Sequence, residues 1–335
     1  MNKIFSVIVT YGYRSHYLFK VIESCFKNGI NKIIVVDNNS KEREKIREFI
    51  LRYRYNNKII YIENNKNLGS AGGFKVGIEK ALEFEDCEFL LLLDDDNKLS
   101  DNAVNVLIST YAVLKKEYGK VILRCYRPAV EGPLDIKRYS KIRCQTYGGF
   151  SLLDIPLKIF KVIFPRKYFR LNKEITKINV IKVCEVVWGG MFINKDLIIK
   201  EDLYPNEKLI IYCDDIEFSY RALRKGVHFF WTKDAYIEDL ENPRGGGTKF
   251  DIFNIVFGSP IRTYYQLRNL EYIHRFVKPC SKRIIIRHLN RFIYLFIIKT
   301  STILFTKFLM FRVINAAIDD GKNKKLGFNE KYYLL

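Results

Sequence analysis

The sequence lacks the cysteine patterns that mark disulfide-rich or zinc-binding proteins. Its seven cysteines are scattered along the chain, and no Cys-x-x-Cys pair occurs among them. Disulfide frameworks and structural zinc sites both need closely patterned cysteines. We therefore expect free thiols in a reducing compartment. A signal peptide is not expected either, because strand-like residues 4–10 follow directly on the start, without an apolar region and a cleavage site.

Long uninterrupted hydrophobic runs are also missing. Residues 292–311 have about the length of a membrane span, but Lys299 and Lys307 lie inside this stretch. A lysine in the middle of a span is costly. We therefore expect this stretch either to lie in a membrane interface or to pack on the rest of the chain.

Two stretches contain no acidic residue at all. Residues 155–173 carry six Lys or Arg, and residues 275–312 carry nine. Over the whole chain, 57 Lys and Arg stand against 37 Asp and Glu, giving a formal charge of +20. Such a charge predicts a polyanionic partner, which could be a nucleic acid, an anionic membrane or a phosphate-bearing substrate. The basic stretches are interleaved with aliphatic runs and no nucleic-acid motif occurs, which disfavours nucleic acid.

The chain has 335 residues, 48% of them hydrophobic, which is enough for one large domain with an appendage or for two domains. Strands are expected at 4–10, 32–36, 58–62 and 89–93, and helices between them at 15–28, 41–54 and 70–84. This alternation predicts an α/β fold with parallel strands. Residues 183–193 look like a further strand, residues 214–225 like a helix, and residues 242–250 like a flexible Gly-rich loop.

Residues 90–97, LLLLDDDN, are the most informative segment. Four leucines predict a strand buried on both faces, and it leads directly into Asp94, Asp95 and Asp96. Ligands bind beyond the carboxyl ends of parallel strands. Asp94 and Asp96 are two residues apart, so both can point to one side and bind a hard divalent cation. A solvated acidic turn remains the alternative for an isolated run of this kind.

Asp214 and Asp215 form a second carboxylate pair at the start of a predicted helix. They either act in catalysis or cap the helix and complement its dipole. Glu217 is a weaker candidate for chemistry, since it is expected to pair with Arg221 one turn later.

Taken together, these motifs resemble the inverting, family-2-type glycosyltransferases that have the GT-A fold and use nucleotide sugars. The matching segments, in the family's order, are VTYGYR, VVDNNS, NLGSAGGF, LLLLDDDN, WGGMFI and DDIEFSYRALRKG. The pair NLGSAGGF and DDD looks most like the galactofuranosyltransferase branch, with its rhamnosyltransferase relatives. SPIRTYYQLRN at 259–269 is similar to the C-terminal part of those enzymes.

The resemblance implies a Rossmann-like mixed sheet with helices on both faces, formed by a catalytic domain over 1–250. A helical region would follow over 251–335, and it would either associate with a membrane or pack on the catalytic domain. It also implies a metal site for Mn²⁺ or Mg²⁺ that bridges the donor diphosphate. The ligands would be Asp94 and Asp96. The residues implied in donor binding are Thr10, Tyr11, Arg14, Asp37, Asn67, Gly69, Gly73 and Asp95.

For the acceptor side, the resemblance implies Asp215 as the catalytic base, opposite the leaving group. Trp188, Gly189, Gly190 and Asp214 would border the acceptor, although Trp188 could equally be a core residue. One departure stands out: this branch commonly completes its metal site with a histidine where this chain has Asp239, beside Glu238. A carboxylate can replace imidazole around Mg²⁺ or Mn²⁺, so Asp239 is the expected third ligand.

The expected function is therefore transfer of galactofuranose from UDP-galactofuranose to a lipid-linked precursor of a cell-surface polysaccharide. The enzyme would lie in the cytoplasm, peripherally at the inner face of the cell membrane. A rhamnosyltransferase using dTDP-rhamnose is the alternative. A nucleotidyltransferase would want a Gly-rich basic loop after the first strand, where this chain has YGYRSH. A basic nucleic-acid- or membrane-binding protein is the non-enzyme alternative.

Overall fold

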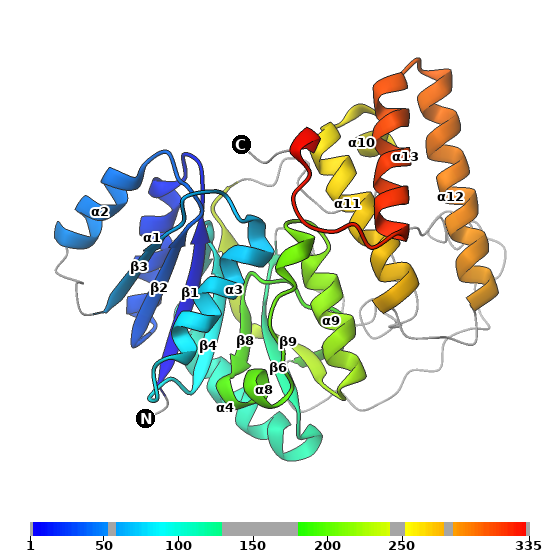
Figure 1. Ribbon diagram of the computed structural model, residues 1–335. Coiled ribbons are helices and arrows are strands. Elements are labelled where there is room, and N and C mark those ends of the chain that lie inside the picture. Colours follow the sequence, from blue (N-terminus) through cyan, green and yellow to red (C-terminus); the bar gives the residue numbers. More distant parts are fainter. Residues whose placement is uncertain (1–2, 53–57, 129–179, 242–251, 278–283, 333–335) are drawn as a thin grey trace.

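The computed structural model describes the chain except residues 1–2, 53–57, 129–179, 242–251, 278–283 and 333–335. The basic stretch 155–173, the Gly-rich loop and part of 275–312 therefore lie outside the described residues. The chain forms one mixed sheet with helices on both faces, followed by a group of C-terminal helices (Figure 1). This is the expected fold class.

The first half of the sheet is parallel. It contains β1 (Ile4–Thr10), β2 (Lys32–Asp37), β3 (Ile59–Glu63) and β4 (Phe89–Asp94), in the spatial order β3-β2-β1-β4. The helices that connect them are α1 (Ser15–Lys27), α2 (Arg43–Arg52) and α3 (Gly69–Leu82). These elements match the sequence prediction to within a few residues. All four strands end at the same edge, which places Thr10, Asp37 and Asp94 beside one another.

The second half of the sheet mixes strand directions. β8 (Met191–Asn194) lies antiparallel to β4 and to β6 (Val121–Tyr126), and β9 (His228–Asp239) lies parallel to β6. β7 (Val180–Val183) and the short β5 (Asn97–Leu99) both pair antiparallel with β9. The β5–β9 pairing places Asn97 opposite Asp239. The end of β9 therefore lies beside the acidic turn that follows β4.

The segment 183–193 differs from its prediction as one strand. It forms the end of β7 and the start of β8, with a turn between them that contains Trp188 and Gly189. Gly190 has φ +84°, and a Cβ there would lie 2.9 Å from Cys125 Cβ. A left-handed backbone with so little space suits glycine, so the two glycines make the turn rather than continue the strand.

Two apolar layers cover the sheet. One contains side chains of α1, α2 and α4 (Ala103–Tyr118). The other contains side chains of α3, α8 (Lys195–Lys200) and α9 (Asp214–Arg224). Because α3 and α9 share this second layer, their N-termini both lie close to the edge at which the parallel strands end.

A third apolar core belongs to the C-terminal helices. These are α10 (Ile252–Phe257), α11 (Pro260–Tyr272) with a π-helical extension at Ile273–Val277, α12 (Ile284–Leu304) and α13 (Phe308–Lys322). They lie beside α9, with α12 at the outer edge of the molecule (Figure 1). Over the described residues, no helix is long and apolar enough to cross a membrane.

The cysteines only partly follow the expectation of free thiols. Cys25, Cys87, Cys125 and Cys213 are free and buried. Cys184 is disulfide-bonded, so the expectation is wrong at this position. A scattered cysteine in a sequence gives no signal for a partner that only the tertiary fold brings near.

Candidate active site

The acidic turn after β4 lies at the centre of the site. Asp94 is the last residue of the strand, and Asp95 is 2% exposed. Thr10, at the end of the neighbouring β1, donates a hydrogen bond from Oγ1 to Asp95 Oδ2 at 2.8 Å. Thr10 at the end of β1 thus holds in place the carboxylate of Asp95, which follows β4.

Arg14 binds the same turn from the loop after β1. Its Nε donates to Asp95 Oδ1 at 2.7 Å, and its Nη2 lies 3.2 Å from Asp96 Oδ2. Nη1 donates to Glu241 at 2.7 Å. Tyr11 is 49% exposed and lies over the Arg14 guanidinium, with 5.5 Å between the ring centre and Cζ. Arg14 therefore contacts the carboxylates directly, and Tyr11 borders the open side of the site.

Arg127, which the sequence did not single out, contacts the other flank of the turn. It hydrogen-bonds to Asp239, and its Nη1 lies 3.6 Å from Asp94 Oδ2. Asn97 donates to Asp239 Oδ1 at 3.0 Å. Asp239 does lie beside the acidic turn, as expected, but its carboxylate is engaged by a side chain that follows β6. The one sequence signal for Arg127 was its place just beyond a predictable apolar strand.

Asp214 and Asp215 come from the opposite side, at the start of α9. Asp214 Oδ2 accepts hydrogen bonds from Trp188 Nε1 at 2.7 Å and from Ser70 Oγ at 2.8 Å. Asp215 makes no such side-chain bond within the described residues and accepts only from the backbone N–H of Ile216. The first aspartate is therefore anchored, and the second is the one whose carboxylate is available for proton transfer.

The Trp188–Gly189–Gly190 turn connects the two carboxylate groups. A Cβ at Gly189 would lie 2.8 Å from Asp94 Oδ2 and 2.2 Å from Asn97 Oδ1, so the turn touches the acidic turn. Trp188 is 4% exposed and packs between Phe74 and Phe218. Its ring has no open face for a sugar, and its contact with the site is the hydrogen bond to Asp214.

The remaining residues expected in donor binding lie at the end of β2 and around the start of α3. Asp37 is fully buried and accepts hydrogen bonds from Ser40 N and from the Tyr61 hydroxyl. Asn67 Oδ1 accepts from Gly69 N at 2.9 Å, and Gly69 has φ +73°. A Cβ at Gly73 would lie 2.7 Å from Asn38 Nδ2. The start of α3 therefore packs closely against the residues that follow β2.

Burial and mutual repulsion raise the pKa values of these carboxyls. Burial raises the pKa of Asp95 to about 7, and that of Asp96 to about 6 with the help of the Asp94 charge. Burial also raises the pKa of Asp94. Burial, and then the neighbouring Asp214, raise the pKa of Asp215. The charge of Asp94 contributes to the shifts at both Asp214 and Asp215, so the two carboxylate groups share one electrostatic site.

The carboxylates suit a divalent cation in part. Asp94 and Asp96 offer hard oxygen ligands whose repulsion a cation would relieve. Asp239 is already satisfied by Arg127 and Asn97. Within the described part of the chain, no three His, Cys, Asp or Glu side chains are grouped closely enough to form a metal site. Asp94 and Asp96 are thus the residues that fit a metal bridging protein and ligand, with Asp239 as third ligand still a prediction.

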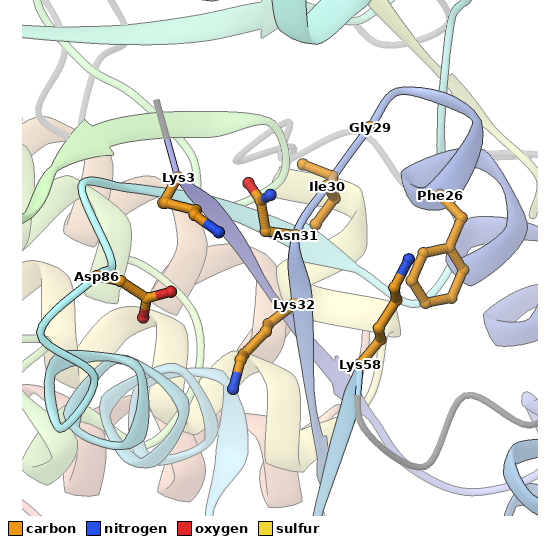
Figure 2. Close-up of a pocket in the computed structure, with 8 residues that line it drawn as sticks. All are labelled: Lys3, Phe26, Gly29, Ile30, Asn31, Lys32, Lys58 and Asp86. Atoms are coloured by element: carbon orange, nitrogen blue, oxygen red, sulfur yellow. The ribbon is translucent and has the colours of Figure 1, made fainter. Parts of the chain in front are cut away.

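A separate pocket lies at the other end of the strands. Figure 2 shows Lys3, Lys32 and Lys58, near the starts of β1, β2 and β3, around a pocket that Asp86 also lines. The length of the sheet separates it from the carboxylates. It is therefore not part of the candidate active site.

Comparison with known proteins identifies the fold and the family. No curated protein matches the chain significantly. Among solved structures, the crystal structure of GalNAc-T7 with UDP, GalNAc and Mn²⁺ is similar, with a TM-score of 0.54 and 14% identity. The similarity covers 88% of this chain and 54% of that one, so this chain spans about half the length of that relative. It confirms the expected GT-A-like fold.

The crystal structure of S. aureus TarS 1–349 in complex with UDP matches less closely. Its TM-score is 0.45 and its identity 12%, over 96% of this chain and 92% of that one. The sequence also matches glycosyl transferase family 2 over residues 6–174. Since this match covers half of the sequence, the chain belongs to glycosyl transferase family 2.

Proposed function

We propose that this protein is a metal-dependent, inverting glycosyltransferase that uses a nucleotide-sugar donor. The observation that carries the proposal is the meeting of two carboxylate groups across one site. Asp94–Asp96 follow a parallel strand, Asp214–Asp215 begin α9, and the Trp188–Gly190 turn touches both. One group suits the donor diphosphate with its cation, and the other suits the acceptor.

The chemistry follows from this division. A bound Mn²⁺ or Mg²⁺, held by Asp94 and Asp96, would neutralise the leaving diphosphate as a Lewis acid. Asp215 takes the proton of the acceptor hydroxyl. The acceptor oxygen then bonds to the anomeric carbon, while the bond from that carbon to the diphosphate breaks. Attack from the face opposite the leaving group inverts the anomeric centre.

Other residues of the chain hold these groups in place. Thr10 and Arg14 fix Asp95 by hydrogen bonds, which sets the acidic turn. Ser70 and Trp188 fix Asp214, which leaves Asp215 as the proton acceptor. Fixed geometry of this kind is what makes a positioned base effective.

For the donor we propose UDP-galactofuranose, and for the acceptor a lipid-linked polysaccharide precursor at the cytoplasmic face of the membrane. The support is the resemblance of NLGSAGGF and LLLLDDDN to the galactofuranosyltransferase branch. A relative of similar fold contains UDP and Mn²⁺, which supports a UDP donor with a divalent cation. dTDP-rhamnose is the second candidate, since the same branch includes rhamnosyltransferases.

The test is release of nucleoside diphosphate from UDP-galactofuranose, UDP-galactose and dTDP-rhamnose, with Mn²⁺ and with a chelator. We expect metal-dependent release of UDP from UDP-galactofuranose when a lipid-linked glycan is present. In calorimetry, Asp94→Asn and Asp96→Asn should lose metal-dependent UDP binding, because an uncompensated diphosphate is repelled by the remaining carboxylates.

Asp101→Asn, at an exposed position after β5, is the matched control. Release of dTDP alone would reassign the donor. Equal UDP binding with and without Mn²⁺ in all variants would remove the metal from the proposal.

A further inference from the structure

The C-terminal helices expose a continuous apolar surface. On the outer face of α12, Phe292 is 65% exposed and Phe296 is 62% exposed, and Ile303 follows two turns later at 51%. The opposite face of the helix carries Tyr294 and Ile298, which are buried in the third core. The helix is therefore apolar on both faces, although only one of them packs against protein.

The turn between α12 and α13 extends this surface. Leu304 is 74% exposed, and Phe305, Phe308 and Leu309 are 56%, 61% and 64% exposed. Phe305 also packs against Phe257 of α10, with 5.3 Å between ring centres. We call residues 303–309 the apolar tip. Such a concentration of exposed large side chains is unusual for a monomer and marks an interaction site.

The charge around this surface has one sign. Lys299 lies on the same helical face as Phe292, Phe296 and Ile303, and Lys307 lies within the apolar tip. Arg312 is exposed one turn further along α13. No acidic residue occurs anywhere from 275 to 312 in the sequence.

We propose that the outer face of α12 and the apolar tip bind an anionic lipid surface. Apolar side chains would enter the headgroup boundary while Lys299, Lys307 and Arg312 contact lipid phosphates. A second copy of the chain fits less well, because a symmetric contact brings identical basic patches together. A true span is disfavoured by the same lysines, and no described helix is apolar enough for one. Binding in the interface brings the site to acceptors carried by lipids.

The experiment is flotation of the full chain with phosphatidylglycerol-containing and pure phosphatidylcholine vesicles. We expect binding to the anionic vesicles alone. It should weaken between ~0.1 M and ~1 M salt, as the Debye length falls from about 10 Å to about 3 Å.

Two double variants separate the contributions of apolar side chains and charge. Phe296→Ser/Phe308→Ser removes apolar contacts, and Lys299→Gln/Arg312→Gln removes charge; each should weaken binding about tenfold or more. Leu51→Ser/Val113→Ser is the matched control. It removes apolar side chains that are 65% and 48% exposed on the other helices, and it should bind as the unmodified chain does.

The proposal is overturned if the control loses as much binding as the apolar variant, or if no anionic vesicle binds. A stable dimer that Phe296→Ser/Phe308→Ser dissociates, without any vesicle binding, would assign the surface to self-association instead.

A second inference concerns α11 and is independent of the first. Arg268 and Asn269, in the segment SPIRTYYQLRN, are both fully buried. Asn269 Nδ2 donates to the backbone carbonyls of Leu209, Ile211 and Tyr212 at 2.9, 2.9 and 2.7 Å. Arg268 Nη2 donates to the carbonyl of Leu209 at 3.0 Å.

The loop that they hold is strained and leads directly to the site. Ile210, Tyr212 and Cys213 have φ values of +67°, +62° and +63°, which non-glycine residues rarely adopt. Such backbone conformations persist only where the surrounding structure holds them in place. Asp214 and Asp215 follow immediately in the sequence. The carbonyl of Ile210 accepts a bond from Ala71 N at the start of α3, so the loop also touches the donor side.

The geometry assigns Asn269 as a positioning residue that holds the 209–213 loop so that Asp215 is correctly placed. This assignment rests on the proposed role of Asp215 as the base. Asn269→Ser removes the amide that bonds three carbonyls, and Asn315→Ser, on α13, removes a half-buried amide that bonds one carbonyl.

We expect Asn269→Ser to lower kcat about 10²-fold, as small misplacements of a catalytic group do, with UDP affinity unchanged. Cys213→Gly should restore part of that loss, because glycine adopts positive φ without a Cβ penalty. If the single variant does not fold, the double variant compared with Cys213→Gly alone gives the same test.

Equal losses of kcat and UDP affinity, or a loss no larger than in Asn315→Ser, would overturn the assignment. Failure of the proposed function is distinct, since the unmodified chain would then release no nucleotide.

Discussion

Asp215 is half-buried beside the buried Asp214, and its environment is what makes it suited to accept a proton. Its own carboxylate bonds only to Ile216 N within the described residues, whereas Asp214 is held by Trp188 and Ser70. We expect Asp215→Asn to lower transfer by roughly 10²–10⁴-fold, the usual contribution of a positioned base, while UDP binding is kept. Glu217→Gln is the control, since Glu217 pairs with Arg221 at 3.1 Å. Near-normal turnover of Asp215→Asn would place the base elsewhere.

The pH dependence of kcat follows from the same burial. A base acts when ionised, and burial together with the Asp214 charge raises the pKa of Asp215 above its usual range. The ionised fraction of Asp215 therefore increases with pH, and kcat should rise with it. The midpoint of this rise should lie at a higher pH than for an ordinary carboxylate. Asp214→Asn removes the neighbouring charge, so the midpoint should move to lower pH. A pH–rate profile that is the same in both proteins would contradict this coupling.

Single residues differed in how far the sequence could predict them. The carboxylates of Asp94, Asp96 and Asp215 follow from motif chemistry, and the structure brings them to one site. The contact of Arg127 with Asp239 could not be foreseen, because it joins residues 112 positions apart through the strand pairings of β6, β9 and β5. The salt bridge of Glu217 with Arg221 was predictable and is confirmed, since it depends only on helical spacing.

The N-terminus of α3 and the 209–213 loop are in direct contact, and this contact fixes Gly69. Gly69 has φ +73°, and a Cβ there would lie 2.1 Å from Ile210 O. Gly69→Ala should therefore displace the loop and lower both the melting temperature and UDP affinity. Gly226→Ala is the matched control, because Gly226 has φ +76° with nothing within 4 Å. Both variants place alanine at a positive φ. Any further decrease in melting temperature in Gly69→Ala therefore reports the contact of α3 with Ile210.

Equal shifts in melting temperature for the two glycine variants would show that the 209–213 loop can move away from an added Cβ at no cost in stability. In that case the contact between α3 and the loop would have no role in holding Asp214 and Asp215.

Among the elements, the parallel strands were predictable because each is a short apolar run between helical periods. The break in 183–193 was not, since it depends on the close approach of Gly189 to Asn97 and of Gly190 to Cys125. The directions of β6, β8 and β9 could not be predicted from the local sequence either. Long-range pairings, rather than residue preferences, decide them.

The C-terminal helices are hydrogen-bonded to the α/β part of the chain. Arg268 and Asn269 of α11 bond the loop before α9, and a Cβ at Gly321 of α13 would lie 2.4 Å from Arg268 O. The domain boundary expected at 250/251 separates the sheet and its covering helices from the C-terminal helices α10–α13. The hydrogen bonds cross this boundary just before Asp214 and Asp215, so the helical region supports the loop that leads to this carboxylate pair.

Removal of α12 and α13 should therefore unfold more than those two helices. Tyr294, Ile298, Val313 and Ile314 are at most 2% exposed, and burial of such side chains contributes about 1.5–3 kcal/mol each. Their sum is on the order of the 5–15 kcal/mol by which whole proteins are stable. We expect the full chain to unfold in a single calorimetric transition, and a chain ending at residue 283 to lose that transition together with UDP binding. A shortened chain that binds UDP with unchanged affinity would show instead that the α/β part folds without α12 and α13.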